Sequence, residues 1–194
     1  DFTPRGTPIP WAALSALAPG QSKARGFEFY SVHDSFFNHS RIFRLAMTKR
    51  FPDVPAVLLE EIVLKDSKGD FDFTGDGDGL FDFDLEGLAM GANGGFWAVS
   101  EGRKDVGGDR EFNRLIKVSA NGKVQDIVEL PAATQALQFR FGFEGVAVVG
   151  SGASETVYVA FQREWDGDPE GNVRIGRYTP ADGEWAFFYY PLDV

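Results

Sequence analysis

The chain has 194 residues, 43% of them hydrophobic and 14% aromatic with nineteen Phe, which excludes a disordered protein and suffices for one domain with its own core. The net charge of −10 argues against a nucleic-acid partner, because binding to a phosphate backbone needs a basic face. There is no Cys, which excludes disulfides and thiolate metal sites, and no apolar run approaches the roughly 20 residues that span a bilayer.

The beginning of the chain gives a weak indication of origin. It opens with Asp1 rather than Met and has no signal-peptide pattern, so we interpret it as a mature or excised piece of a longer precursor. The lack of Cys is compatible with export but does not locate the protein.

The first predicted elements form a series of four short strands, and this series recurs twice. The first copy comprises LSALA (14–18), a turn over PGQSKARG, FEFYSVHD (27–34), RIFRL (41–45) and VLLEEIVL (57–64). The second comprises LEGLA (85–89), FWAVSE (96–101), RLIKV (114–118) and VQDIVEL (124–130). The third comprises FEGVA (143–147), VYVAFQ (157–162), RIGRY (174–178) and EWAFFYYPL (184–192). Alternating side chains with β-branched and aromatic residues predict strands, and ANGK (120–123) and ADGE (181–184) predict hairpin turns.

Four antiparallel strands repeated in this way predict an all-β fold, a β-propeller with about three blades in this chain. We place the blades at 14–64, 85–130 and 143–192 within one partial domain over 1–194, and an acidic loop at 65–84. A β-sandwich is the competing architecture, although it would not need the same register to recur. Because propellers close with ~4–8 blades, the chain is expected to belong to a longer propeller or to be completed by a complementary chain or a second copy.

The segment 66–86 is rich in carboxylates, which are Asp66, Asp70, Asp72, Asp76, Asp78, Asp82, Asp84 and Glu86. Acidic runs are usually solvated loops, and we expect solvent around Asp66, Asp70 and Asp72. The segment fits the EF-hand template badly, because the twelfth position counted from Asp70 or Asp72 is Phe81 or Phe83 instead of Glu.

The start of strand one and the end of strand two of a blade lie at the same mouth of a propeller channel. Pairing Met90 with Phe96 puts Leu85 opposite Glu101 and Glu86 opposite Ser100. The same logic places Glu144 near Gln162 in the third copy, and Ser15 near Asp34 in the first. Carboxylates from separate blades are therefore predicted to converge, where a hard, oxygen-seeking cation such as Ca²⁺ would offset their repulsion. Arg103, Arg140 and Arg163 flank this mouth, and they either hold an anionic substrate or neutralise the acids.

These residues resemble the phytase-like, "esterase-like activity of phytase" β-propeller family. The resemblance rests on DLEGLA with GGFWAVSEG (84–102), RLIKVSANGKV (114–124), FGFEGVA (141–147) and the stretch from VYVAFQ to YYPLD (157–193). Members are generally longer, with further blades after the Y-P-L-D segment. The chain departs from the commoner pattern at Gln162, where a Glu often ends the second strand.

The resemblance implies a secreted or periplasmic, calcium-dependent phosphoric-ester hydrolase that acts on an anionic phosphate ester at the channel mouth. Matched by motif, the candidate ligands are Glu86, Glu101 and Glu144, followed by Asp34 and Asp84, and Arg140 or Arg103 would contact phosphate. The alternative is a non-catalytic, calcium-stabilised propeller that serves as a binding or assembly module.

Overall fold

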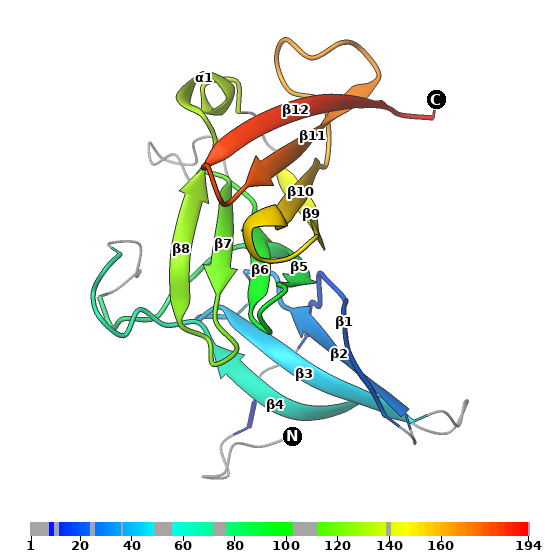
Figure 1. Ribbon diagram of the computed structural model, residues 1–194. Coiled ribbons are helices and arrows are strands. Elements are labelled where there is room, and N and C mark those ends of the chain that lie inside the picture. Colours follow the sequence, from blue (N-terminus) through cyan, green and yellow to red (C-terminus); the bar gives the residue numbers. More distant parts are fainter. Residues whose placement is uncertain are drawn as a thin grey trace.

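The computed structural model describes residues 8–9, 12–23, 26–35, 37–48, 56–71, 77–102, 112–138 and 141–193. In these ranges the chain forms twelve strands in three four-stranded antiparallel sheets, with almost no helix (Figure 1). Within every sheet, each strand pairs with the next strand of the sequence. The predicted all-β architecture, a partial propeller of three blades, is confirmed.

Each sheet is one blade of the propeller. Blade 1 contains β1 (Ala18–Lys23), β2 (Gly26–Val32), β3 (Arg41–Thr48) and β4 (Val57–Val63). Blade 2 contains β5 (Leu85–Met90), β6 (Phe96–Ser100), β7 (Arg114–Val118) and β8 (Val124–Glu129). Blade 3 contains β9 (Phe143–Val149), β10 (Thr156–Phe161), β11 (Asn172–Thr179) and β12 (Glu184–Pro191). A short helix, α1 (Ala132–Gln135), connects blades 2 and 3, and one 3₁₀ turn (Gly152–Ser154) precedes β10.

The blades fan out around their first strands. In Figure 1, β1, β5 and β9 lie on the inner side of the arc, whereas β4, β8 and β12 lie on its outside. Strand β5 contacts both β1 and β9, so residues at the start of β5 and β9 become neighbours although they are far apart in the sequence.

The two larger core clusters lie at the interfaces between blades, and a third, smaller cluster of Phe43, Leu45 and Leu58 lies within blade 1. The alternation along β6 explains the two interfaces. All five residues of β6 are buried. Phe96 and Ala98 belong to the cluster shared with blade 1, whereas Trp97 and Val99 belong to the cluster shared with blade 3. Because successive side chains of a strand point to opposite faces, a strand that packs between two blades is buried at every position, and Ser100 is the one polar residue of β6.

The boundary of the first strand differs from the prediction. We expected a strand at 14–18 and a turn over 19–26, but β1 spans Ala18–Lys23, and Leu14 only forms an isolated bridge with His33. Pro19 lies within β1, which is tolerated because β1 is the edge strand of its sheet. The predicted hairpin turns at 120–123 and 181–184 are confirmed, with Gly122 and Gly183 at φ of 84° and 72°.

No helix among the described residues is both long enough and apolar enough to cross a membrane.

Candidate functional site

In all three blades, a residue just after the second strand forms the same backbone hydrogen bond with the segment that precedes the first strand. The backbone N–H of Asp34 donates to Ala13 O at 3.0 Å, that of Glu101 to Asp84 O at 2.8 Å, and that of Gln162 to Gly142 O at 2.8 Å. Asp34, Glu101 and Gln162 therefore occupy equivalent positions, as the repeat predicted.

Glu86 and Glu144 each lie at a β-bulge. Leu85 pairs with Ser100 and Gly87 with Val99, so Glu86 is the additional residue of its strand. The predicted pairing of Glu86 with Ser100, and of Leu85 with Glu101, is therefore wrong by one position. The third blade has the same irregularity, because Phe143 pairs with Phe161 and Gly145 with Ala160. A bulge re-aims its side chain, and bulges are frequent beside functional sites.

Carboxylates from blades 1 and 2 converge at this end of the molecule. Asp34, Asp84 and Glu86 each offer an oxygen, and these oxygens all lie within 4.8 Å of one another. We call these three residues, together with Glu144, the acidic cluster. Glu144 comes close enough to act electrostatically on Glu86, and Asp84 acts on Glu144.

The close approach of β5 and β9 brings Glu144 into the acidic cluster. A Cβ on Gly87 would lie 2.7 Å from Val99 Cγ2 and 3.0 Å from the backbone oxygen of Glu144. Only glycine leaves room for the two bulges to contact each other. The Glu-Gly pair of the sequence motif thus combines a charged side chain with the space that its neighbour strand needs.

Burial and mutual repulsion raise the pKa values of carboxyl groups in the acidic cluster. Burial, followed by the charges of Asp84 and Glu144, raises the pKa of Glu86 from 4.5 to about 7, against a hydrogen bond from Ser15. Burial and the neighbouring Asp34 raise the pKa of Asp84, which the N–H of Ser35 at 3.2 Å opposes.

The pKa of Glu144 is raised for the same reasons. Glu144 as a whole residue is exposed, but partial burial of its carboxylate is the largest cause and the charge of Asp84 the next, whereas a hydrogen bond with Gln162 acts in the opposite direction. Ionised oxygens gathered without enough compensating charge suit a hard cation, which prefers carboxylate and carbonyl ligands.

Glu101 has a contact that the sequence did not suggest. Its Oε1 accepts a hydrogen bond from the backbone N–H of Gly142 at 2.8 Å, which joins the end of β6 to the start of β9. Asn113, which sequence reasoning missed, makes a second connection between the same segments. A single Asn before a strand carries no motif, so nothing in the sequence marks it.

Of the three predicted substrate-binding arginines, the described residues include only Arg163. Its exposed guanidinium lies over the ring of Phe141, 4.6 Å from the ring centroid. Phe141 has a φ of 70°, and its carbonyl accepts a hydrogen bond from Trp165 Nε1 at 3.3 Å. Arg163 thus lies next to the segment that leads into Glu144. Arg103 and Arg140 lie outside the described residues.

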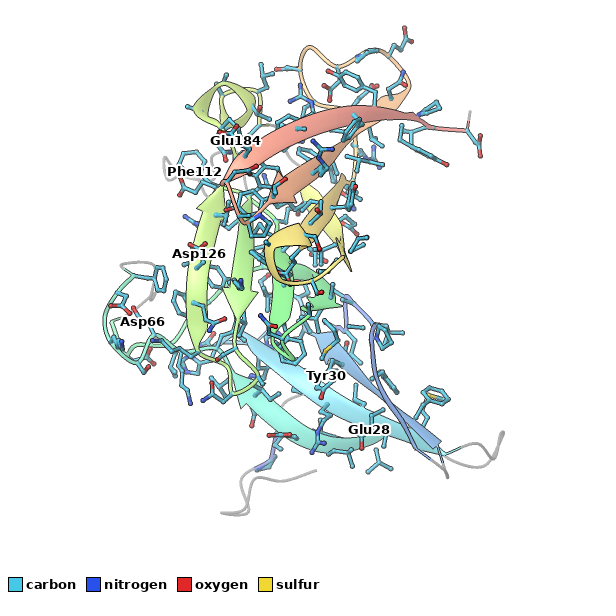
Figure 2. The ribbon with its side chains drawn as sticks, viewed as in Figure 1. Glu28, Tyr30, Asp66, Phe112, Asp126 and Glu184 are labelled. Carbon is cyan, nitrogen blue, oxygen red and sulfur yellow. The ribbon has the colours of Figure 1, made fainter. Side chains whose placement is uncertain are left out.

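The acidic loop has more structural roles than predicted. Asp66 was expected in solvent but is only 6% exposed, because its carboxylate accepts the backbone N–H groups of Lys68 and Phe71 at 3.1 and 2.7 Å. Burial alone would raise the pKa of Asp66, but these hydrogen bonds outweigh burial and lower it. Figure 2 shows Asp66 in the loop beside the start of β8. Asp70 is exposed as expected, and Asp72 lies outside the described residues.

Three radiating blades, with carboxylates gathered near the start of their first strands, define a partial β-propeller with a cluster of acidic side chains at one end. The family model described as "Phytase-like: Esterase-like activity of phytase" matches residues 9–194, and the chain belongs to this family. Comparisons with curated proteins and with solved structures give no match.

Proposed function

We propose that the acidic cluster binds Ca²⁺ and that this site hydrolyses phosphoric esters. The observation that carries the proposal is the convergence of Asp34, Asp84 and Glu86 from two blades within 4.8 Å. Membership of the phytase-like family supports the reaction class.

The donor set fits calcium. It consists of carboxylate oxygens without a His or a Cys, and oxygen ligands are what Ca²⁺ selects over the softer transition metals. The raised pKa values of Glu86, Asp84 and Glu144 support a site that a cation stabilises, since their charged forms repel one another in the free protein.

A bound Ca²⁺ would supply a Lewis acid that polarises a phosphoryl oxygen and makes a nearby water more acidic. The residues of the protein would position the ion and the substrate and neutralise their charges. Asp34, Asp84 and Glu86 would hold the ion, with Glu144 beside them, and Glu101 would contribute through its contact with Gly142. Arg163 would bind the anionic phosphate through paired N–H donors while Phe141 supports its guanidinium.

Turnover of a phosphomonoester such as p-nitrophenyl phosphate, measured with Ca²⁺ and with EDTA, tests this function. We expect activity that depends on calcium and that Glu86→Gln abolishes. Absence of metal-dependent turnover in the complete protein would count decisively against hydrolysis.

The second candidate is a non-catalytic platform that calcium stiffens. It is favoured by the same repulsion, because a cation that relieves it stabilises the junction of the blades whether or not a reaction follows. This alternative expects the melting temperature to rise with Ca²⁺ in the absence of turnover.

Exposed apolar surface on blades 1 and 3 supports the existence of a partner. Blade 3 exposes Phe188 and Tyr190 by 48% and 56%, and blade 1 has an apolar hollow of about 400 Å³ lined in part by Phe27 and Met47. Apolar surface of this kind marks an interaction site, so a complementary chain or a second copy would cover it. A monomer that unfolds cooperatively, seen by light scattering and calorimetry, would contradict this partner.

A secreted or periplasmic location belongs to the same proposal. It is supported by the family, and the absence of Cys from the sequence is compatible with it. Fractionation of the native host would test it.

A further inference from the structure

The side-chain amide of Asn113 joins blade 2 to the strand that carries Glu144. Asn113 is fully buried and directly precedes β7. Its Oδ1 accepts the backbone N–H of Gly102 at 3.1 Å and that of Phe143 at 2.7 Å. Because both partners are donors, the oxygen of the amide must face them. Its Nδ2 has no hydrogen-bond partner among the described residues.

The backbone of Gly142 packs directly against the side-chain amide of Asn113. A Cβ on Gly142 would come within 1.9 Å of Asn113 Oδ1, so the backbone passes as close to the amide as glycine allows. Gly142 also donates its N–H to Glu101 Oε1 and accepts the N–H of Gln162, both at 2.8 Å. The backbone before Glu144 is therefore held by hydrogen bonds at consecutive peptide groups.

We propose that Asn113 is a positioning residue for the acidic cluster. Through the N–H of Phe143 it fixes the start of β9, and thereby holds the carboxylate of Glu144 against Asp84 and Glu86. The inference rests on the proposed function, in which the acidic cluster binds Ca²⁺. Groups that orient metal ligands without touching the metal typically contribute about 10–100-fold to metal affinity.

Glu155 provides a matched control, because it also joins blades 2 and 3. Its buried carboxylate accepts Trp97 Nε1 at 3.0 Å and the backbone N–H of Ala92 at 3.2 Å. Ala92 lies in the turn after β5, at the end of blade 2 opposite the acidic cluster. Loss of Glu155 should weaken the same interface without moving Glu144.

The test compares Asn113→Ala with Glu155→Ala in the intact chain. The dissociation constants of Ca²⁺ by calorimetry and of Tb³⁺ by luminescence are measured well below the melting temperature of each variant. We expect both variants to melt earlier, and only Asn113→Ala to weaken cation binding, by about tenfold or more. Unchanged binding in Asn113→Ala, or equal weakening in both variants, would overturn the proposal.

Two further variants separate positioning from general damage. Asn113→Asp keeps an oxygen that accepts both hydrogen bonds and should restore most of the affinity. In a Glu144→Gln background, Asn113→Ala should cause little additional loss, because Asn113 acts through Glu144. Fully additive losses would contradict that route. If Asn113→Ala does not fold, Asn113→Ser, which can accept one of the bonds, replaces it with a smaller expected loss.

Failure of the proposed function would look different. If the wild type binds neither Ca²⁺ nor Tb³⁺, calcium binding is wrong, and the metal-free protein decides the role of Asn113. NMR order parameters should then show the Glu144 backbone amide becoming more mobile in Asn113→Ala and unchanged in Glu155→Ala. No difference between the two would overturn the positioning role.

Discussion

Replacing Glu86 with Gln keeps the shape of the side chain and removes the charge that its neighbours repel. In the unfolded chain Glu86 ionises near 4.5, whereas the fold raises its pKa to about 7. The unfolded state therefore loses this proton first, and the free energy of unfolding falls as the pH rises from 4.5 to 7. Above pH 7 the full cost is present, and below 4.5 it is absent.

The size of this cost follows from the two pKa values. Each pH unit between them corresponds to about 1.4 kcal/mol, which gives an upper bound of roughly 3.5 kcal/mol. Glu86 is only half-buried, so solvent screening reduces the figure to roughly 1–2 kcal/mol. For a chain of this length, we expect Glu86→Gln to raise the melting temperature by roughly 2–8 °C at pH 8 without calcium.

The assay is thermal unfolding at pH 4 and pH 8, in EDTA and in excess Ca²⁺. At pH 4 the variant and the wild type should melt together. In calcium at pH 8 the order should reverse, because the wild type gains about 2.7 kcal/mol at a Ca²⁺ concentration of 100 times Kd. Glu86→Gln loses a ligand and should gain much less.

Glu184→Gln serves as the control, since Glu184 is an exposed carboxyl on the outer strand β12 (Figure 2). It should melt like the wild type under all four conditions. If Glu86→Gln is no more stable than the wild type at pH 8 in EDTA, the cost that burial and the neighbouring carboxylates impose on a charged Glu86 has been misjudged. If it still gains the full stabilisation from Ca²⁺, Glu86 is not a ligand.

Three further predictions concern the stability of the fold. Gly87→Ala should lower the free energy of unfolding, measured in urea, by roughly 1–3 kcal/mol, because the added Cβ meets backbone atoms and a packed Val. The equivalent Gly145→Ala should cost little, because its Cβ would lie 3.7 Å from its nearest neighbour. Equal effects of the two substitutions would refute the close contact of the bulges. Glu155→Ala should lower the free energy of unfolding, measured by calorimetry, by roughly 2–4 kcal/mol, because the indole N–H of Trp97 and a backbone N–H lose their acceptor. An unchanged melting temperature would contradict this contact between blades 2 and 3. The lowered pKa of Asp66 stabilises the fold at pH values above the ordinary pKa of 3.8, and this stability disappears as the pH falls through the folded pKa. Asp66→Asn should therefore melt earlier than the wild type at pH 7, and the two melting temperatures should converge in acid. A difference that does not change with pH would rule out the charge as the cause.

The sequence by itself determined the blades. Alternation along each strand and the recurrence of LEGLA and FEGVA are local patterns, and a four-stranded antiparallel meander follows from them without knowledge of distant contacts. The same motifs marked Glu86 and Glu144, because a repeat that aligns the strands also aligns the residues at their ends.

The tertiary structure alone decided which side chains meet. The bulge at Glu86 shifts the register by one residue, and a strand pattern with a period of two does not reveal an inserted residue. The burial of Asp66 depends on the path of its own loop, and the role of Asn113 depends on how closely β9 approaches blade 2. These features arise from the angles and spacing between blades, which are set by packing over the whole interface and not by any short stretch of sequence.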